Sequence, residues 1–394
     1  MTTPRFSQRL PATFFDRVQA QLREGLAAID CDALITDDPE DVAYLTGFFH
    51  HPCERPVAVW IGADGTTLLL LPELERDHAL WQHARAEIVA YPEFPGVVPP
   101  FRHLRAAIPG AAAVAFTDTI TQRRLTALQS AVPGVRWLAT DLVQRQRYVK
   151  HPEEIGLHAE AARITDLMLA AGIELIRDAA AGGGPLPSEA ELAAHVGAVG
   201  TGTMYDEHTE VVVVAPMAGG LVYAAENSVR PHGLPSGYRL RRGDTFMLSL
   251  GCAVGGRFVE GERTFILGEP TADQRRYYEA VLSAQQIGGA AIRPGALCRE
   301  ANAACLAVIR EAGLGQHLRH RQGHGIGLGM HEPPWLEGGD RTPLAAGMIV
   351  SNEPGIYVAG HAGYRISDSM LVTEDGARPL TGYPRDLPSA VIQV

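Results

Sequence analysis

The chain has 394 residues, of which 46% are hydrophobic and 20% charged, so it is long enough for two soluble globular domains with separate cores. Its formal net charge of −11 at pH 7 provides no basic surface for nucleic acid and disfavours anionic membranes. No apolar run approaches the roughly 20 residues of a membrane span, and residues 1–9 lack signal-peptide features, so a cytoplasmic location is expected.

Helices and strands are predicted to alternate through the first part of the chain, up to about Lys150. Apolar residues at helical spacing alternate there with short apolar runs that carry turn residues on either side. Such alternation is typical of a single α/β domain. The predicted elements are a helix over 12–29, a strand over 33–36, a hairpin over 57–71, a strand over 113–116 and a helix over 121–130.

A second domain is predicted to begin after the break at Lys150, where a long helix over 153–178 follows. Ser188 and Glu191 stand in capping-box register and predict the start of the next helix. We therefore predict domains over 1–150 and 151–394. The further elements expected are strands near 207–214, 244–250, 347–352 and 363–373, and helices near 272–290 and 298–312.

The stretch 243–265 predicts two short strands joined through Gly251, Gly255 and Gly256. Alternate residues of a strand share a face, so the carboxylates of Glu260 and Glu262 should lie side by side. Two like charges this close repel each other unless solvent, a cation, a proton or a metal ion lies between them. A simpler alternative is a solvated ion pair between Glu262 and its neighbour Arg263.

Three further polar clusters lie in the second domain. His232 lies in a predicted turn, where it is either a site residue or part of an exposed turn. Glycines flank His324 on both sides, which allows close approach of backbone or ligand, and His331 follows seven residues later. Glu353 ends an apolar strand, and an unpaired buried carboxylate is costly. Imidazoles and carboxylates together indicate a metal site or proton-transfer chemistry.

Five scattered cysteines without a C-x-x-C pair are expected to be free thiols in a reducing compartment. Cys252 lies near the paired carboxylates and is an alternative nucleophile. Negative charge raises the pKa of a thiol, which disfavours this role.

The motifs of the second domain resemble the creatinase/prolidase/methionine aminopeptidase family. They are His-Gly-Ile-Gly-Leu from His324, Asn-Glu-Pro-Gly-Ile-Tyr from Asn352 and Gly-Tyr-Arg-Ile from Gly363. The resemblance implies an α/β (α+β) fold in which a creatinase-type N-terminal α/β domain precedes a pita-bread catalytic domain with pseudo-twofold symmetry. It also implies a homodimer in which the N-terminal domain contributes to the neighbouring site.

The chain departs from the metal-binding pattern that the resemblance implies. Metal-dependent relatives use Asp, Asp, His, Glu and Glu, and the corresponding positions here are Ser249, Glu260, His324, Glu353 and Ser367. Serine hydroxyls are poor ligands for hard dications. Neither a metal nor another cofactor is therefore expected, although one weakly held ion on the three remaining ligands stays open.

The resemblance is nearest to metal-independent creatinase and implies a hydrolase of a C–N bond in a small guanidine, amidine or amide metabolite. Glu262 and Glu353 would bind a planar cation, as paired carboxylates can. His232 would transfer a proton, and His324 and His331 would stabilise the tetrahedral intermediate. The remaining expected substrate-binding residues are Glu260, Arg55 and Trp335.

Several alternatives remain open from the sequence. The main one is a metal-dependent Xaa-Pro aminopeptidase or dipeptidase that tolerates Ser249 and Ser367. Attack by a carboxylate, a lyase reaction and a non-catalytic binding protein are the others. Trp335 and the aromatic run from Phe48 to His51 are expected either to flank the pocket or to serve as core packing.

Overall fold

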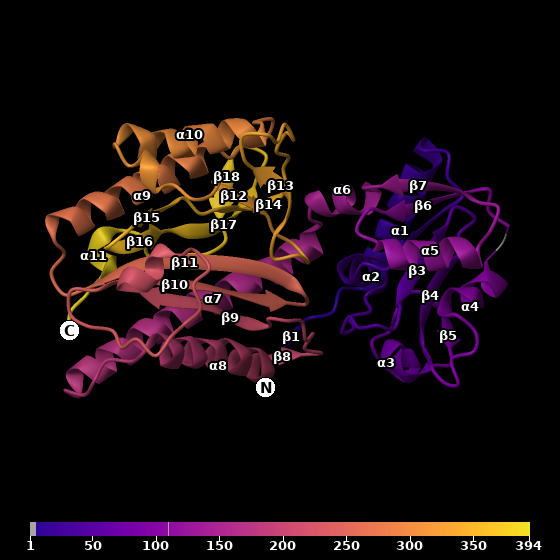
Figure 1. Ribbon diagram of the computed structural model, residues 1–394, viewed down its shortest axis with the longest axis horizontal. Coiled ribbons are helices and arrows are strands. Elements are labelled where there is room, and N and C mark those ends of the chain that lie inside the picture. Colours follow the sequence, from indigo (N-terminus) through magenta and orange to yellow (C-terminus); the bar gives the residue numbers. More distant parts are fainter. Residues whose placement is uncertain (1–4, 109) are drawn as a thin grey trace. The chain divides into compact units, whose positions relative to one another are not determined.

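Figure 1 shows the computed structural model, which describes residues 5–108 and 110–394. Residues 1–4, part of the segment examined for a signal peptide, lie outside the described residues. The described residues form two compact units: an N-terminal unit, Arg9–Arg147, and a C-terminal unit that comprises Tyr148–Val394 together with residues 5–8. Within the described residues, no helix is both long and apolar enough to cross a membrane.

The N-terminal unit is built on a mixed sheet with the strand order β5-β4-β3-β2-β6-β7. Strands β2, β3 and β4 pair antiparallel, and the outer pairs are parallel. The apolar side chains of Trp60, Leu70 and Val114 belong to its core. The elements are α1 (Ala12–Ala28), β2 (Ala33–Thr36), α2 (Pro39–Thr46), β3 (Ala58–Gly62), β4 (Thr67–Pro72), η1 (Glu73–Glu75), α3 (Arg76–Trp81), β5 (Glu87–Tyr91), α4 (Pro100–Ala107), β6 (Ala113–Thr117), α5 (Gln122–Ala131), β7 (Arg136–Thr140) and α6 (Leu142–Tyr148).

The C-terminal unit contains a larger sheet with the strand order β13-β12-β14-β17-β11-β10-β9, to which β18 and β19 add at the sides. Its strands are β9 (Ala218–Ala224), β10 (Thr245–Val254), β11 (Arg257–Leu267), β12 (Gly323–Gly325), β13 (Glu332–Leu336), β14 (Ile349–Asn352), β17 (Ser367–Val372), β18 (Ala377–Pro379) and β19 (Val391–Ile392). Two small strand pairs accompany it, β1 (Phe6–Ser7) with β8 (His208–Thr209), and β15 (Gly355–Val358) with β16 (Ala362–Arg365).

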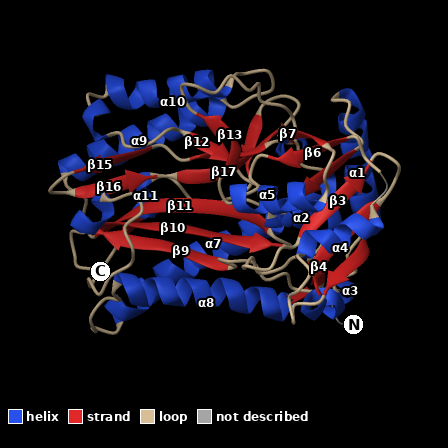
Figure 2. Cartoon of the chain, turned by 45° about the vertical axis from the view of Figure 1, so that its right-hand side comes forward, coloured by secondary structure: helices blue, strands red, loops and turns tan. Residues whose placement is uncertain are grey.

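Helices cover both faces of this sheet. Figure 2 shows α8 (Glu189–Glu207) on one side and α9 (Ala272–Ala291) with α10 (Cys298–Glu311) on the other. The long helix α7 (Pro152–Ala181) packs against β10 and β11. The shorter elements are η2 (Ala225–Val229), η3 (Gly315–His317) and α11 (Leu387–Ala390).

The predicted capping box is present at the start of α8, where Ser188 Oγ accepts from the Glu191 backbone N–H and Glu191 Oε2 accepts from the Ser188 N–H. These bonds satisfy backbone donors that the first helical turn leaves free, and so fix the point at which the helix begins.

Two predicted strands need correction. The expected strand near 207–214 is wrong, because β8 stops at Thr209 with its partner β1 and Val213 is exposed in an irregular segment. A valine-rich run becomes a strand only where a second strand lies beside it to pair with. The hairpin over 243–265 is longer than predicted: its turn uses Gly255 and Gly256 at φ 56° and 75°, and Gly251 lies inside β10.

Candidate active site

The antiparallel pairing of β10 and β11 positions the two predicted carboxylates. Glu260 is paired with Gly251 and Glu262 with Ser249, so both glutamates face the same side of the sheet. Oxygen atoms of Glu260, Glu262 and Glu353 lie within 4.8 Å of one another. The prediction that these carboxylates lie side by side is confirmed.

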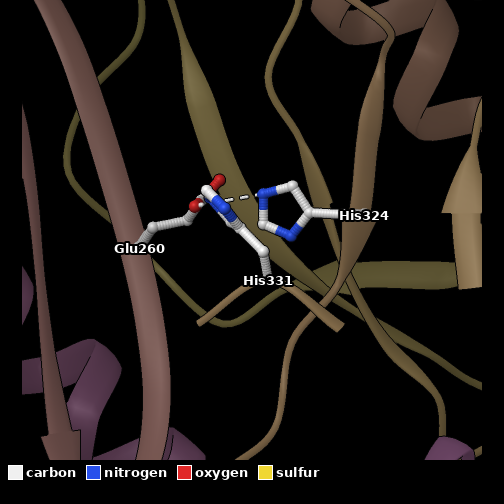
Figure 3. A group of neighbouring side chains, drawn as sticks. All are labelled: Glu260, His324 and His331. Carbon is white, nitrogen blue, oxygen red and sulfur yellow. Dashed lines mark ion pairs between the residues drawn. The ribbon is translucent and has the colours of Figure 1, made fainter. Parts of the chain in front are cut away.

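His324 is held at the centre of this acidic cluster by β12. Its Nε2 atom lies 3.2 Å from Glu353 Oε1 and 3.6 Å from Glu260 Oε2, and Figure 3 shows the ring pointing towards Glu260. Gly323 lies so close to β14 that a Cβ there would approach the carbonyl oxygen of Ser351 to 2.1 Å. Glycine is therefore required for the strand packing that presents the imidazole.

The charges around His324 are unevenly satisfied. His324 is only 2% exposed, and its Nε2 atom has no well-aligned hydrogen-bond partner. Burial opposes the imidazolium, but the charges of Glu260 and Glu353 outweigh burial and raise the pKa of His324 to about 9. Burial, together with the charge of Glu353, raises the pKa of Glu260, so this pair of carboxylates retains a proton above the usual range. A buried imidazole without an aligned partner, placed between two carboxylates with perturbed pKa values, is a candidate functional site.

Glu262 is neutralised by a residue that the sequence analysis did not select, Arg365. The Arg365 guanidinium lies 2.7 Å from Glu262 Oε1 through Nη2 and 2.5 Å from Oε2 through Nε, and both side chains are buried. Ser249 Oγ also donates to Glu262. The alternative of a solvated pair with Arg263 is wrong, because Arg263 lies on the other face of β11 and binds Asp368.

Two tyrosine hydroxyls hold Arg365 in place, and a histidine supports one of them. Its Nη2 group donates to Tyr223 Oη at 2.7 Å, and Nη1 donates to Tyr357 Oη at 3.0 Å. Tyr357 Oη lies 2.8 Å from His320 Nε2, and His320 Nδ1 lies 2.8 Å from the carbonyl oxygen of Arg321. None of these residues was selected from the sequence. The one available signal was the Gly-Tyr-Arg-Ile motif, which contains Arg365.

His331 lies beside His324 (Figure 3), and the centroids of the two rings are 4.1 Å apart. Partial desolvation of the ring, and then the charge of His324, lowers the pKa of His331 to about 4, so the ring is neutral at pH 7. His232 is exposed in its turn, and it contributes only weakly to the electrostatic environment of the His331 ring.

Trp335 is paired with His324 across β12 and β13. The Arg321 guanidinium lies over the Trp335 ring, 4.3 Å from the ring centroid.

Arg55 belongs to the N-terminal unit, where its guanidinium pairs with Glu54 at 2.9 Å and with Glu93. Its predicted contribution to a neighbouring site remains a prediction. Phe48 is fully buried and stacks on His50, so this residue serves as core packing.

Cys252 is also core packing. Its thiol donates to the carbonyl oxygen of Ala161 at 3.2 Å, and burial raises its pKa to about 12. This geometry does not support a nucleophilic thiol.

The residues present fit a divalent ion. Glu260, His324 and Glu353 offer two carboxylate oxygens and one imidazole nitrogen around the unpartnered Nε2 atom, with His331 as a further neighbour. Oxygen and nitrogen donors of this kind suit hard and borderline dications. Ser249 and Ser367 instead donate their hydroxyl protons to Glu262 and Glu260.

Comparison with known families identifies both parts of the chain. The model of metallopeptidase family M24 matches residues 156–374, and that of the creatinase/prolidase N-terminal domain matches residues 18–149. The chain belongs to metallopeptidase family M24. This membership confirms the predicted creatinase-like N-terminal domain, the pita-bread domain and the expectation of a hydrolase of C–N bonds.

Relatives of this M24 protein carry names of peptidases. A probable dipeptidase PepE of Mycobacterium tuberculosis is 33% identical over 384 residues, which cover 97% of this chain and 98% of that protein. The crystal structure of dipeptidase PepE from Mycobacterium ulcerans is 29% identical, covers 98% of this chain and 100% of that chain, and superposes with a TM-score of 0.84. The prolidase from Pyrococcus horikoshii OT3 is 25% identical, covers 94% and 99%, and gives a TM-score of 0.82.

These relatives show that the creatinase-like interpretation is wrong, since they are named as dipeptidases and prolidases. The structure supplies the physical reason. Glu262 was assigned to a substrate guanidinium, but its carboxylate is already bound by the guanidinium of Arg365 from the same chain. A motif shows that a carboxylate is present without showing which cation it binds.

Proposed function

We propose that this M24 protein is a dipeptidase that hydrolyses small peptides, with Xaa-Pro dipeptides among the candidate substrates, and that it requires a divalent metal ion. The observation that carries the proposal is the convergence of Glu260 and Glu353 on the unpartnered Nε2 atom of buried His324. The names of the dipeptidase and prolidase relatives support the same substrate class.

Glu260, His324 and Glu353 would hold the ion. When bound, a divalent ion supplies Lewis acidity, which polarises a peptide carbonyl and makes water more acidic. The structural fit rests on the donor set, in which two carboxylates lie beside one imidazole.

Glu353 would act as the proton carrier of the reaction. It would accept a proton from the attacking water as the C–O bond forms, and it would return that proton to the leaving nitrogen as the C–N bond breaks. Ser351 Oγ lies 3.4 Å from Glu353 Oε1 and contacts the carboxylate from its own strand.

His331 would bind the oxygen of the scissile carbonyl. Its neutral ring can donate one N–H bond, and it lies next to His324 at the edge of the cluster. His232, exposed in its turn, would provide a second imidazole for proton transfer. Trp335 would flank the substrate, as predicted.

The test is hydrolysis of a panel of dipeptides, with and without proline in the second position, by protein treated with chelator and by protein resupplied with Mn²⁺ or Co²⁺. We expect turnover only in the resupplied sample, and loss of that turnover in Glu353→Gln. Glu269→Gln, a change at an exposed glutamate, is the matched control and should retain it. Chelator-resistant cleavage, or no cleavage of any dipeptide, would contradict the proposal.

A further inference from the structure

The acidic cluster contains two overlapping groups of potential metal ligands that share Glu260. One group joins Glu260 to His324 and His331, and the other joins Glu260 to Glu262 and Glu353, each with ligand atoms within 4.8 Å of one another among the described residues. Taken by position alone, these groups could accommodate one ion or two.

The two groups differ in what already occupies them. In the first, buried His324 Nε2 lies 3.2 Å from Glu353 Oε1 and 3.6 Å from Glu260 Oε2 without an aligned bond to either, so an ion that replaced the Nε2 proton would meet both carboxylates. In the second, both oxygens of Glu262 lie in contact with the Arg365 guanidinium, at 2.7 Å and 2.5 Å. Glu262 is therefore neutralised before any ion arrives.

Arg365 cannot readily move away to release Glu262. Its side chain is 5% exposed, and it donates to the hydroxyls of Tyr223, Tyr357 and Ser249 at 2.7, 3.0 and 2.9 Å. The Tyr357 hydroxyl can accept a hydrogen bond from Arg365 while it donates its own proton to His320 Nε2, so the hydroxyl proton of Tyr357 is already used. Arginine stays charged under all ordinary conditions.

Ser249 completes this arrangement between Glu262 and Arg365. It accepts from Arg365 and donates to Glu262, so its hydroxyl is fully used within the pair. Ser367 likewise donates to Glu260 Oε1 at 2.8 Å. Neither hydroxyl offers a free anionic oxygen to a second dication.

We propose that this site takes a single divalent cation, on Glu260, His324 and Glu353, and that Arg365 is a fixed positive charge that neutralises Glu262 and excludes a second ion. The proposal rests on the metal dependence of the proposed function. It deepens that function by assigning different tasks to two glutamates on the same strand face: Glu260 is a ligand, and Glu262 is the anchor of an internal cation.

The experiment measures ion binding without substrate. The full-length protein is stripped with chelator and titrated with Mn²⁺ by calorimetry, and the bound ion is counted by elemental analysis. We expect one Mn²⁺ per chain at saturation, with the electron paramagnetic resonance spectrum of an isolated ion. Two ions per chain, a spin-coupled pair or no bound ion would overturn the proposal.

Glu260→Gln and Glu262→Gln form a matched pair, because the two residues lie two positions apart on the same face. Glu260→Gln should raise the Kd for Mn²⁺ at least about 100-fold, whereas Glu262→Gln should change it less than about 3-fold. Equal losses would overturn the assignment. If Glu262→Gln does not fold, the double variant Glu262→Met with Arg365→Met removes both partners together and should still bind one ion.

Because this measurement needs no peptide, it separates the two proposals. One bound ion without dipeptide cleavage would contradict the proposed function and support the single-ion site. Cleavage of dipeptides with two bound ions per chain would support the proposed function and contradict the single-ion site.

Discussion

Two buried clusters of charge lie on opposite faces of β11, and their hydrogen bonding differs. On one face, Arg263 donates to Asp368 Oδ1 at 2.8 Å and to the carbonyl oxygens of Ser367 and Tyr383 at 2.6 Å each. Asp368 in turn accepts from Gln285, Thr381 and Arg385 at 2.6 to 2.7 Å. On the other face, His324 meets two carboxylates at 3.2 and 3.6 Å, without an aligned bond.

This contrast separates charges that support the fold from charges that are available for chemistry. A buried charge with every donor and acceptor satisfied belongs to the packing, and removal of its partner leaves an uncompensated charge. A buried charge without aligned hydrogen bonds lowers the stability of the fold. Such a charge is retained where a bound ligand supplies the missing interactions. The Glu262–Arg365 pair lies between the two kinds, because Arg365 Nη2 donates to Glu262 Oε1 at 2.7 Å whereas Nε and Oε2 form no aligned bond.

The largest effect is expected for Glu353→Gln, which should lower kcat/KM for a dipeptide by about 10³-fold, within the usual range for loss of acid–base catalysis. The free energy of unfolding should fall, but by less than on removal of the Asp368 charge, because His324 loses its contact with Glu353 and keeps the one with Glu260. Peptidase assays and urea unfolding check the two parts. If Glu353→Gln lost stability but kept its activity, Glu353 would belong with the charges that support the fold, and the contrast between the two clusters would be wrong.

Asp368→Asn should show the opposite pattern and destabilise the protein by about 3–5 kcal/mol, because Arg263 would lose the partner that compensates its buried charge. The exposed residue Glu374 provides a matched control, and Glu374→Gln should change the free energy of unfolding by less than about 0.5 kcal/mol. Urea unfolding midpoints of the three proteins are the measurement. Equal midpoints would show that the Arg263 cluster does not stabilise the fold.

A smaller effect, dependent on pH, is expected for His158, which is fully buried in α7 and lies 2.8 Å from the carbonyl oxygen of Phe258 through Nδ1. Burial, and then the charge of Lys150, lowers the pKa of His158 to about 3 in the folded state. Below about pH 6.5, His158 therefore binds a proton in the unfolded chain but stays neutral in the folded chain. Stability from this residue is complete above pH 6.5 and is lost as the pH falls towards 3.

The expected loss from His158 at pH 5 is about 2 kcal/mol relative to pH 7. Unfolding free energies of wild type and His158→Asn at both pH values isolate this contribution, because the variant lacks the titrating ring. An identical pH dependence in both proteins would exclude His158 as its source.

The smallest effect is expected away from both clusters, at the capping box of α8. Ser188→Ala removes the hydroxyl that accepts from the Glu191 N–H at 3.2 Å and should cost about 1 kcal/mol. Thermal unfolding measures this loss, and Ser188→Asn should restore most of the stability. Peptidase activity should be unaffected in both variants.

The features of the fold that were predicted correctly depend on residues that lie close together in the sequence. The capping box at Ser188 and Glu191 depends on residues three positions apart, and the hairpin that carries Glu260 and Glu262 depends on strand alternation. The strand expected near 207–214 was wrong because strand formation depends on a partner elsewhere in the chain, and β1 pairs with only two of these residues. The function was misassigned for a related reason, since the partner of Glu262 was inferred from a resemblance.

Backbone geometry alone places Glu260 and Glu262 on one face and explains the glycines around His324, so both features could be predicted from the order of the residues. Which cation each carboxylate meets depends on the packing of distant segments. Arg365, which follows Glu262 by 103 positions, is brought to it by packing, while Glu260 and Glu353 are left to His324. Electrostatic partnership depends on distance in space and on shielding from water, and neither quantity can be obtained from spacing along a chain.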